Sequence, residues 1–343
     1  MPSTAPQLVA NRWPHRLAVA LALTTFPLLW VGGLVTTYQA GMAVPDWPNT
    51  YGWNLFLYPL STWIAGPWDL FIEHGHRLLG SLAGMLSIAL LVVVWRKESP
   101  RWLKRAAAGV LALVCLQGVL GGLRVLLDAR TVALVHACIG PLFFAATLLL
   151  AQLTAPSWSG RHPLAAADGR RFAAAAWLTA GLAYVQIIFG ALLRHLPIDA
   201  PPGLFRSALI LHLVLAGVLL FQVSLLAVMA QVGLRKLARC NQGWLRWPAE
   251  GLLLLVVWQI SLGLATYVVK YAFPAWMDSF QFAAGYVVQE KSLVKSVVTT
   301  LHVASGALLF AGTTVLALRA SRLFFRSTAS SFVWPACTLR AAT

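Results

Sequence analysis

Eight apolar runs, each roughly 20 residues or slightly longer, constrain this chain more than any other feature. They cover, to within a few residues, 17–38, 73–95, 104–126, 131–153, 172–195, 207–231, 249–271 and 293–318. A bilayer core about 30 Å thick needs a helix of this length, and backbone polar groups in lipid must be satisfied within the segment. Because the runs do not alternate, barrel strands are excluded. The sequence predicts an all-α membrane protein with eight transmembrane helices.

Composition and charge agree with this fold class. Of the 343 residues 59% are hydrophobic and 10% charged, whereas a soluble domain has about a quarter charged residues. The net charge of +16 would suggest nucleic acid in a soluble protein, but here the basic residues lie in short loops. Eighteen of the 26 Lys and Arg fall on the side of the membrane that holds both chain ends. We therefore expect cytoplasmic termini and no nucleic-acid partner.

The compartment follows from what the first residues lack. The run that starts at residue 17 has no small-residue cleavage site, so we interpret it as a retained span. A transit segment rich in Ser and Arg is also absent. We expect a multi-pass protein of a bacterial inner (plasma) membrane, surrounded by lipid.

The helices match weakly in two halves of four. A Gln-x-x-x-Gly pattern recurs on the odd-numbered spans, at 117–121, 186–190 and 259–263, and His-x-x-x-Gly occurs at 136–140 and 302–306. Small residues at this spacing let helices approach closely, which is the main explanation for them. Four spans per half predict a parallel repeat, built as two four-helix bundles. The expected organisation is bundles over 1–153 and 172–326, a cytoplasmic linker over 154–171 and a disordered tail over 327–343.

The widest outer connections are expected at 39–72 and 272–292. The first is rich in aromatic residues, including Trp47, Trp53 and Trp63. Two interpretations stay open: an aromatic belt at the membrane interface, which the aromatics alone favour, or a lid over a pocket.

Apart from His74, which neighbours His76 but points to another face of the helix, each even-numbered span carries one histidine near its outer end: His76, His136, His212 and His302. Each follows the last charged residue of the preceding outer loop by six or seven positions. At 1.5 Å per residue, all four lie at nearly one depth, roughly 10 Å past those charges. Since the even spans run in the same direction, the two imidazoles of each bundle can face each other.

A single histidine in a membrane helix is most often a hydrogen-bond partner for another helix, and this interpretation stays open for each one. Four histidines at matching depth in a duplicated bundle are harder to explain as helix-to-helix hydrogen-bond partners alone. Two facing imidazoles in a four-helix bundle are a standard means of holding a haem iron by both axial positions. Zinc is disfavoured, because two histidines per bundle are too few ligands and no Cys or second carboxylate lies at that depth.

The halves differ beside these histidines. Glu73 and Arg77 flank His76, whereas the residues around His212 are apolar. Glu73 stands one turn before His76 on nearly the same face, where a carboxylate can move protons or face a cation developing on a substrate. The alternative is a first-turn Glu favoured by the helix dipole and paired with Arg77. The asymmetry predicts chemistry in the first bundle and an electron-transfer haem in the second.

Basic residues near the outer boundary can pair with haem propionates, and Arg77, Arg124 and Arg194 are the best candidates. For most of the others, ordinary snorkelling to the interface is the preferred interpretation.

Taken together, Glu-x-x-His-Arg at 73–77, the single later histidines and Gly-Met-Ala-Val-Pro-Asp-Trp-Pro at 41–48 make the chain resemble the haem A synthase family. The resemblance covers the chain up to about residue 322. It implies an oxidoreductase that converts the C8 methyl group of haem O to a formyl group, through successive hydroxylations. The product, haem A, serves terminal cytochrome oxidases.

The resemblance also implies roles for residues and partners. His76 and His136 would ligate the substrate haem O and its product haem A, Glu73 would be the essential acid, and His212 and His302 would ligate a haem b that relays electrons. Haem O synthase would supply the substrate. The electron donor, a quinol or a ferredoxin-like protein, stays open, as do the oxygen source, dioxygen or water, and the formation of homo-oligomers.

One departure concerns cysteine. Many bacterial members of the family carry a cysteine pair in outer loops, but neither long outer loop contains Cys here. The chain therefore resembles the cysteine-poor branch, and a thiol redox step is in doubt. Two other functions stay open from the residues: a di-haem b-type cytochrome linked to quinol, and a transporter with histidines as proton relays.

Overall fold

The computed structural model describes residues 12–97, 99–159, 167–197, 199–233 and 239–324. Within these residues, eight helices are long and apolar enough to cross a membrane. They are Trp13–Thr37 (α1), Trp68–Arg96 (α3), Arg101–Leu126 (α4), Arg130–Thr154 (α5), Ala167–His195 (α7), Pro202–Val228 (α8), Arg239–Tyr271 (α9) and Leu293–Phe324 (α11). The described part of the chain contains no β-strand. The prediction of an all-helical, multi-pass membrane protein with eight spans is confirmed.

Several helices begin earlier than the apolar runs indicate. Pro67, Pro100 and Pro201 each stand directly before the first residue of α3, α4 and α8. Proline is tolerated there because the first N–H groups of a helix have no partner within it. The first turns carry polar residues such as Asp69 and Arg101. Hydropathy marks the apolar length of a helix, so it leaves these turns out.

Short elements fill the connections. The segment between α1 and α3 contains a 3₁₀ turn, Ala40–Met42 (η1), and a short helix, Leu60–Ile64 (α2). The segment between α9 and α11 contains Ala275–Met277 (η3) and Gln281–Ala284 (α10), and a π turn, Met229–Gly233 (η2), follows α8. The predicted linker holds Pro156–Ser159 (α6) and the first turn of α7; the predicted tail over 327–343 lies outside the described residues.

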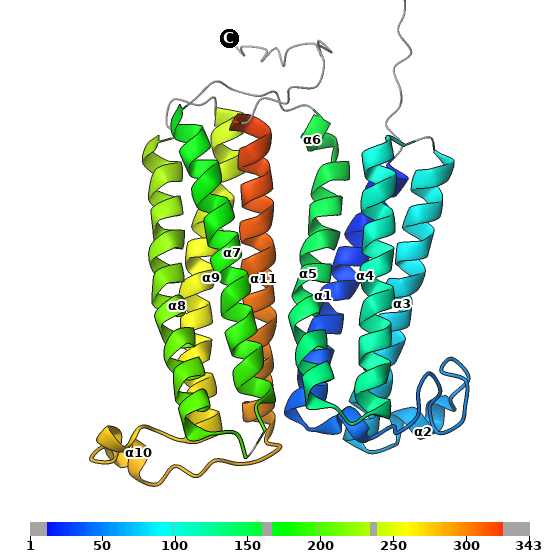
Figure 1. Cartoon of the computed structure of the whole chain (residues 1–343), viewed down its shortest axis with the longest axis vertical. Helices are drawn as coiled ribbons and strands as arrows, with labels where there is room; N and C mark the ends of the chain where they lie inside the picture. Colours follow the sequence, from blue (N-terminus) through cyan, green and yellow to red (C-terminus); the bar gives the residue numbers. More distant parts are fainter. Residues whose placement is uncertain (1–11, 98, 160–166, 198, 234–238, 325–343) are drawn as a thin grey trace, which may run out of the picture.

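The long helices form two groups of four that stand side by side (Figure 1). In one group α1, α3, α4 and α5 pack in a closed ring, and in the other α7, α8, α9 and α11 do the same. α11 also packs on α1 and α5, which makes it the central helix of the molecule. The grouping follows the predicted halves, and the internal repeat between them stays a prediction.

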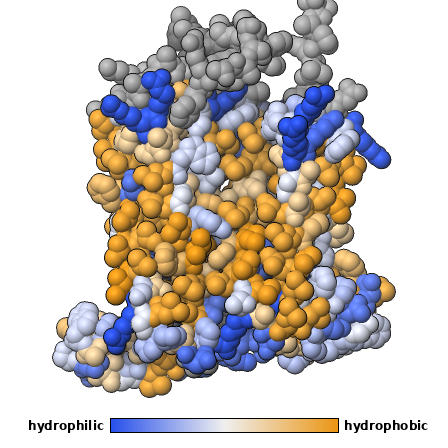
Figure 2. Space-filling view, in the orientation of Figure 1, coloured by the Kyte–Doolittle hydropathy of each residue, from blue (hydrophilic) through white to orange (hydrophobic). Residues whose placement is uncertain are grey.

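Each group has its own apolar core, and a third core joins them. Phe144 of α5, Ala183 of α7 and Phe310 of α11 belong to this joining cluster, against which Phe26 of α1 packs. On the face shown in Figure 2, apolar side chains cover most of the middle, with hydrophilic ones gathered toward both ends. The start of α1 and the end of α11 lie at one end, opposite α2 and α10 (Figure 1). Which end faces the cytoplasm stays a prediction.

Candidate functional site

Each group of four helices brings two of the predicted histidines together. The ring centroids of His76 on α3 and His136 on α5 are 6.5 Å apart, and the ring planes cross at 83°. Those of His212 on α8 and His302 on α11 are 6.3 Å apart at 75°. A bond between an imidazole nitrogen and a metal is about 2 Å long, so two rings on opposite sides of one ion have centres roughly 6 Å apart. Both pairs therefore suit one ion held between two rings.

The imidazoles are half-buried, and their polar atoms are incompletely satisfied. The Nδ1 atoms of His76, His136 and His212 are buried without a hydrogen-bond partner, which costs about 1 to 3 kcal/mol for each group. Across the described residues, no group of three or more His, Cys, Asp or Glu could hold a bare metal ion. The available donors come in twos, as a bis-imidazole porphyrin site requires.

Glu73 and Arg77 fasten the first outer loop to α3. Glu73 is only 2% exposed; its Oε2 accepts a hydrogen bond from the Val44 N–H at 2.9 Å, and its Oε1 accepts one from Arg77 at 2.9 Å. Arg77 also donates to the carbonyls of Val44, Asp46 and Asn49, at 2.8, 2.7 and 2.8 Å. Glu73 and Arg77 thus form an ion pair, with Glu73 about one helical turn before His76 and Arg77 directly after it.

Other residues of this loop pack against the end of the bundle. The hydroxyl group of Thr50 lies 3.0 Å from Nδ1 of His74, whose ring packs between those of Tyr58 and Trp63. Trp47 packs on Gly122 of α4, where no side chain would fit. These residues pack against the bundle end while others of the loop are exposed, and both interpretations of the aromatic loop stay open. The exposed aromatics include Trp53 and Phe56.

Asp46 fixes the tip of the loop. Its two carboxylate oxygens accept hydrogen bonds from the N–H groups of Tyr51 at 2.8 Å and Gly52 at 2.7 Å. Burial alone would raise the pKa of Asp46, but these two hydrogen bonds and the Arg77 charge outweigh it and hold the pKa below its ordinary value. Gly52 has φ +77°, a conformation that glycine adopts without strain.

The other two predicted arginines contact α1 or the segment that follows it. Arg124 of α4 donates to the carbonyl of Gly41 at 3.0 Å. Arg194 of α7 donates to the Gly33 carbonyl and the Thr37 hydroxyl group of α1, at 2.6 and 2.7 Å, and so joins the two bundles. Lys270 of α9 adds a further positive charge near Arg194. Positive charge therefore gathers near the ends of α4, α7 and α9, where carboxylates of a ligand would be attracted.

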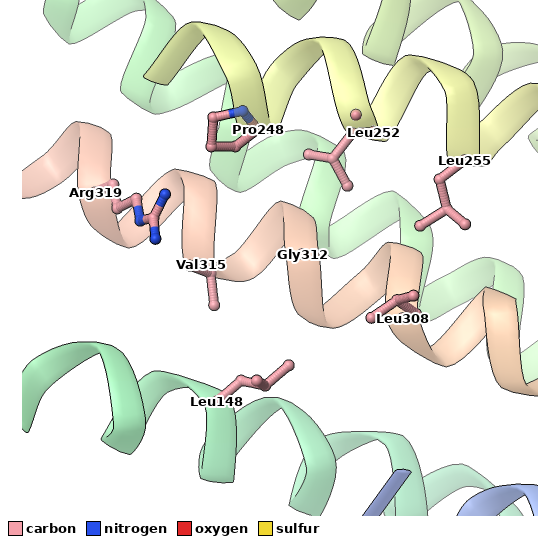
Figure 3. A pocket seen from close by; sticks show the side chains of 9 residues that line it. Leu148, Pro248, Leu252, Leu255, Leu308, Gly312, Val315 and Arg319 are labelled. Carbon is pink, nitrogen blue, oxygen red and sulfur yellow. The ribbon is translucent and has the colours of Figure 1, made fainter. Parts of the chain in front are cut away.

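A separate cavity of about 320 Å³ opens between α5, α9 and α11 (Figure 3). Apolar residues, four of them leucines, line most of it, with Arg319 at one end. None of the four paired histidines lines this cavity.

Sequence reasoning missed one feature of the histidine pairs. It assigned the recurring glycines to helix packing, but three of them, Gly121, Gly190 and Gly263, face the paired imidazoles directly. Gly32, which belongs to no recurring pattern, faces His76 in the same way. The fixed four-residue spacing of the Gln-x-x-x-Gly pattern was the available signal.

Comparison with known proteins adds independent information. Residues 67–198 match the family model described as Cytochrome oxidase assembly protein. This segment contains Glu73, His76, Arg77 and His136, but neither histidine of the second pair. The matched segment runs from α3 to α7, so it lacks α1 of the first bundle and includes α7 of the second.

Three relatives show the extent of the similarity. A protein named "Heme A synthase" from Shouchella clausii is 28% identical over 184 residues, which are 52% of this chain and 58% of the relative. One of the same name from Symbiobacterium thermophilum is 40% identical over 115 residues, 32% and 34% of the two chains. A "Protoheme IX farnesyltransferase" from Halobacterium salinarum is 27% identical over 168 residues, 49% and 34%. The matches span less than two thirds of each relative.

Proposed function

We propose that this chain, which belongs to the haem A synthase family, is itself a haem A synthase that oxidises the C8 methyl group of haem O to a formyl group. The observation that carries the proposal is the first histidine pair. The ring centroids of His76 and His136 lie 6.5 Å apart, and Glu73 stands one helical turn before His76. All three residues lie inside the segment that matches the family model. A haem-binding pair with an adjacent fixed carboxylate suits a haem that is chemically altered.

In this proposal the first pair, His76 and His136, holds the substrate haem, and the second pair, His212 and His302, holds a resident haem b. The spacing of the second pair fits one iron as well as that of the first. A bound haem b would supply one-electron transfer. Arg124 and Arg194 would donate N–H groups to the propionates. Arg77 instead donates hydrogen bonds to loop carbonyls and to Glu73. Arg77 therefore acts on the loop and on the acid.

Glu73 is proposed as the acidic residue of the reaction. Its two hydrogen bonds, from the Val44 N–H and from Arg77, fix one orientation of the carboxyl group. A preoriented carboxylate beside the substrate can accept a proton or face positive charge developing on the reacting carbon. No charged group takes this place beside His212, which supports different roles for the two pairs.

Substrate supply and location complete the proposal. The partial match to a protein named for the farnesylation of protohaem IX supports a farnesylated haem as substrate, supplied by a haem O synthase. We place the protein in a bacterial inner membrane with cytoplasmic termini, as the distribution of Lys and Arg predicts. A quinol or ferredoxin-like protein would donate electrons.

Co-expression with a haem O synthase tests the activity. In a host that makes haem O but no haem A, expression of this chain should produce haem A, identified by mass in extracted pigments. The same host carrying an empty vector is the control. If the purified protein retains haem but the extracted haem is never altered, the chain is an electron-transfer cytochrome instead. A colourless, fully helical protein would favour a transporter.

A further inference from the structure

Each paired histidine lies against the same two-position element of a neighbouring helix. The element consists of a glycine and the residue four positions before it, and we call it the cradle. The four cradles are Leu28 and Gly32 on α1 for His76, Gln117 and Gly121 on α4 for His136, Gln186 and Gly190 on α7 for His212, and Gln259 and Gly263 on α9 for His302.

The glycine makes room for the ring. A Cβ atom built on Gly32 would lie 2.8 Å from Cε1 of His76, and one on Gly190 or Gly263 would lie 3.1 Å from Cε1 of the facing histidine. At Gly121 the distance is 3.4 Å, an ordinary contact. Three of the four imidazoles therefore occupy space that any side chain would compete for.

The spacing of four places an acceptor beside that space. In an α-helix the carbonyl of residue i accepts the N–H of residue i+4, so the carbonyl of the first cradle residue lies next to the glycine. Nδ1 of His302 lies 3.2 Å from the Gln259 carbonyl oxygen. In the other three cradles the ring lies against the glycine, but its Nδ1 makes no hydrogen bond to the corresponding carbonyl. Those carbonyls belong to Leu28, Gln117 and Gln186.

The glutamine side chain fixes the backbone of the histidine. Gln186 Nε2 donates to the His212 carbonyl at 2.9 Å, and Gln259 Nε2 donates to that of His302 at 2.9 Å. The hydrogen bond from Gln117 to the His136 carbonyl is 3.2 Å long. At the fourth cradle the residue is Leu28, which has no amide to donate. A glutamine amide thus fixes the backbone carbonyl of three histidines, and the cradle of His76 lacks this amide.

We infer that the cradles are positioning elements for the axial ligands of two haems, an inference that rests on the proposed function. The carbonyl would accept the Nδ1–H, which leaves Nε2 to bind iron, and such partners normally orient metal-bound histidine. The glycine sets how far the ring can turn, and hence the crossing angle of each pair. The missing amide at Leu28 makes His76 the least fixed ligand. His76 belongs to the pair proposed for the substrate haem, which must enter and leave its binding site.

A pair of glycine variants on α7 tests the positioning of His212. Gly190→Ala adds a methyl group 3.1 Å from the ring, whereas a Cβ on Gly181 meets nothing within 4 Å, so Gly181→Ala is the matched control. In purified full-length protein expressed with haem b, Gly190→Ala should change the low-spin ferric EPR signal and shift the haem midpoint potential. Near-perpendicular imidazole planes give a strongly anisotropic signal, which a turned ring would alter. Gly181→Ala should match the parent protein.

A glutamine variant tests the same inference with less risk to the fold. Gln186→Leu gives α7 the residue that α1 carries at this position. It should raise the rate of haem b transfer to apomyoglobin about 10-fold or more, in line with the usual effect of losing a partner that orients a metal ligand. Gln222→Leu, at a polar α8 residue outside the cradles, is the control.

These experiments distinguish failure of the cradle inference from failure of the proposed function. An unchanged EPR signal and potential in Gly190→Ala, or unchanged haem release in Gln186→Leu, would overturn the cradle while leaving the proposed function intact. Parent protein that binds no haem would overturn both.

Discussion

Replacing His212 or His302 with alanine is expected to abolish retention of haem b. Each variant removes one of two rings whose centroids lie 6.3 Å apart, so the iron would lose an axial ligand. Loss of a residue that merely orients a metal ligand costs about 10- to 100-fold in affinity, and loss of the ligand itself should exceed about 100-fold. Pyridine haemochrome analysis of purified protein, with the optical spectrum of the reduced form, measures the effect.

His195→Ala is the matched control for these variants, because His195 lies in the same bundle but in neither pair. It should retain haem b like the parent. Circular dichroism on all three variants separates ligand loss from unfolding. Full haem b content in folded His212→Ala and His302→Ala proteins would contradict the assignment of the second pair.

Glu73→Ala is expected to stop the formation of haem A while the protein still binds haem. The two ring ligands of the first bundle remain, but the buried carboxylate that accepts hydrogen bonds from Val44 and Arg77 is lost. A group that moves protons in a reaction typically contributes about 10²- to 10⁴-fold, so product should fall by about that factor. Chromatography and mass analysis of pigments from a haem O-producing host measure product and bound haem together.

Because Glu73 also fastens the outer loop, its chemical role needs a loop control. Asp46→Asn weakens the hydrogen bonds to Tyr51 and Gly52 at the loop tip and leaves Glu73 in place. Limited proteolysis should show a looser loop in Asp46→Asn, with most product formation retained. If the two variants were equally sensitive to protease and Asp46→Asn lost as much product as Glu73→Ala, Glu73 would act only by holding the loop in place.

The spans and the histidine pairs were within reach of sequence reasoning for physical reasons. Apolar length reports directly on the bilayer, which is why eight helices were predicted. Equal depth from the outer charges placed the four imidazoles at one level, and the structure brings His76 to His136 and His212 to His302. Helix starts were less accessible, since the polar first turn of α3 after Pro67 lies outside the apolar run.

The loop and the cradles could not be predicted in the same way. Arg77 was assigned to propionates because its place near the outer boundary suits them, yet its N–H groups are bound by carbonyls of Val44, Asp46 and Asn49. Carbonyls belong to every residue, so such partners have no signature in sequence. Gly32 likewise looks like any small residue of a packed helix until the ring of His76 is placed against it.

Counting haem in the purified chain tests the central claim most directly. Protein expressed with both haem b and haem O should contain two low-spin, six-coordinate haems per chain. One should be haem b, and the other haem O or its oxidised product. Loss of His136 should remove only the haem O or its oxidised product, and loss of His302 should remove only haem b. A chain that binds one haem or none, or whose haems persist without these histidines, would contradict the account.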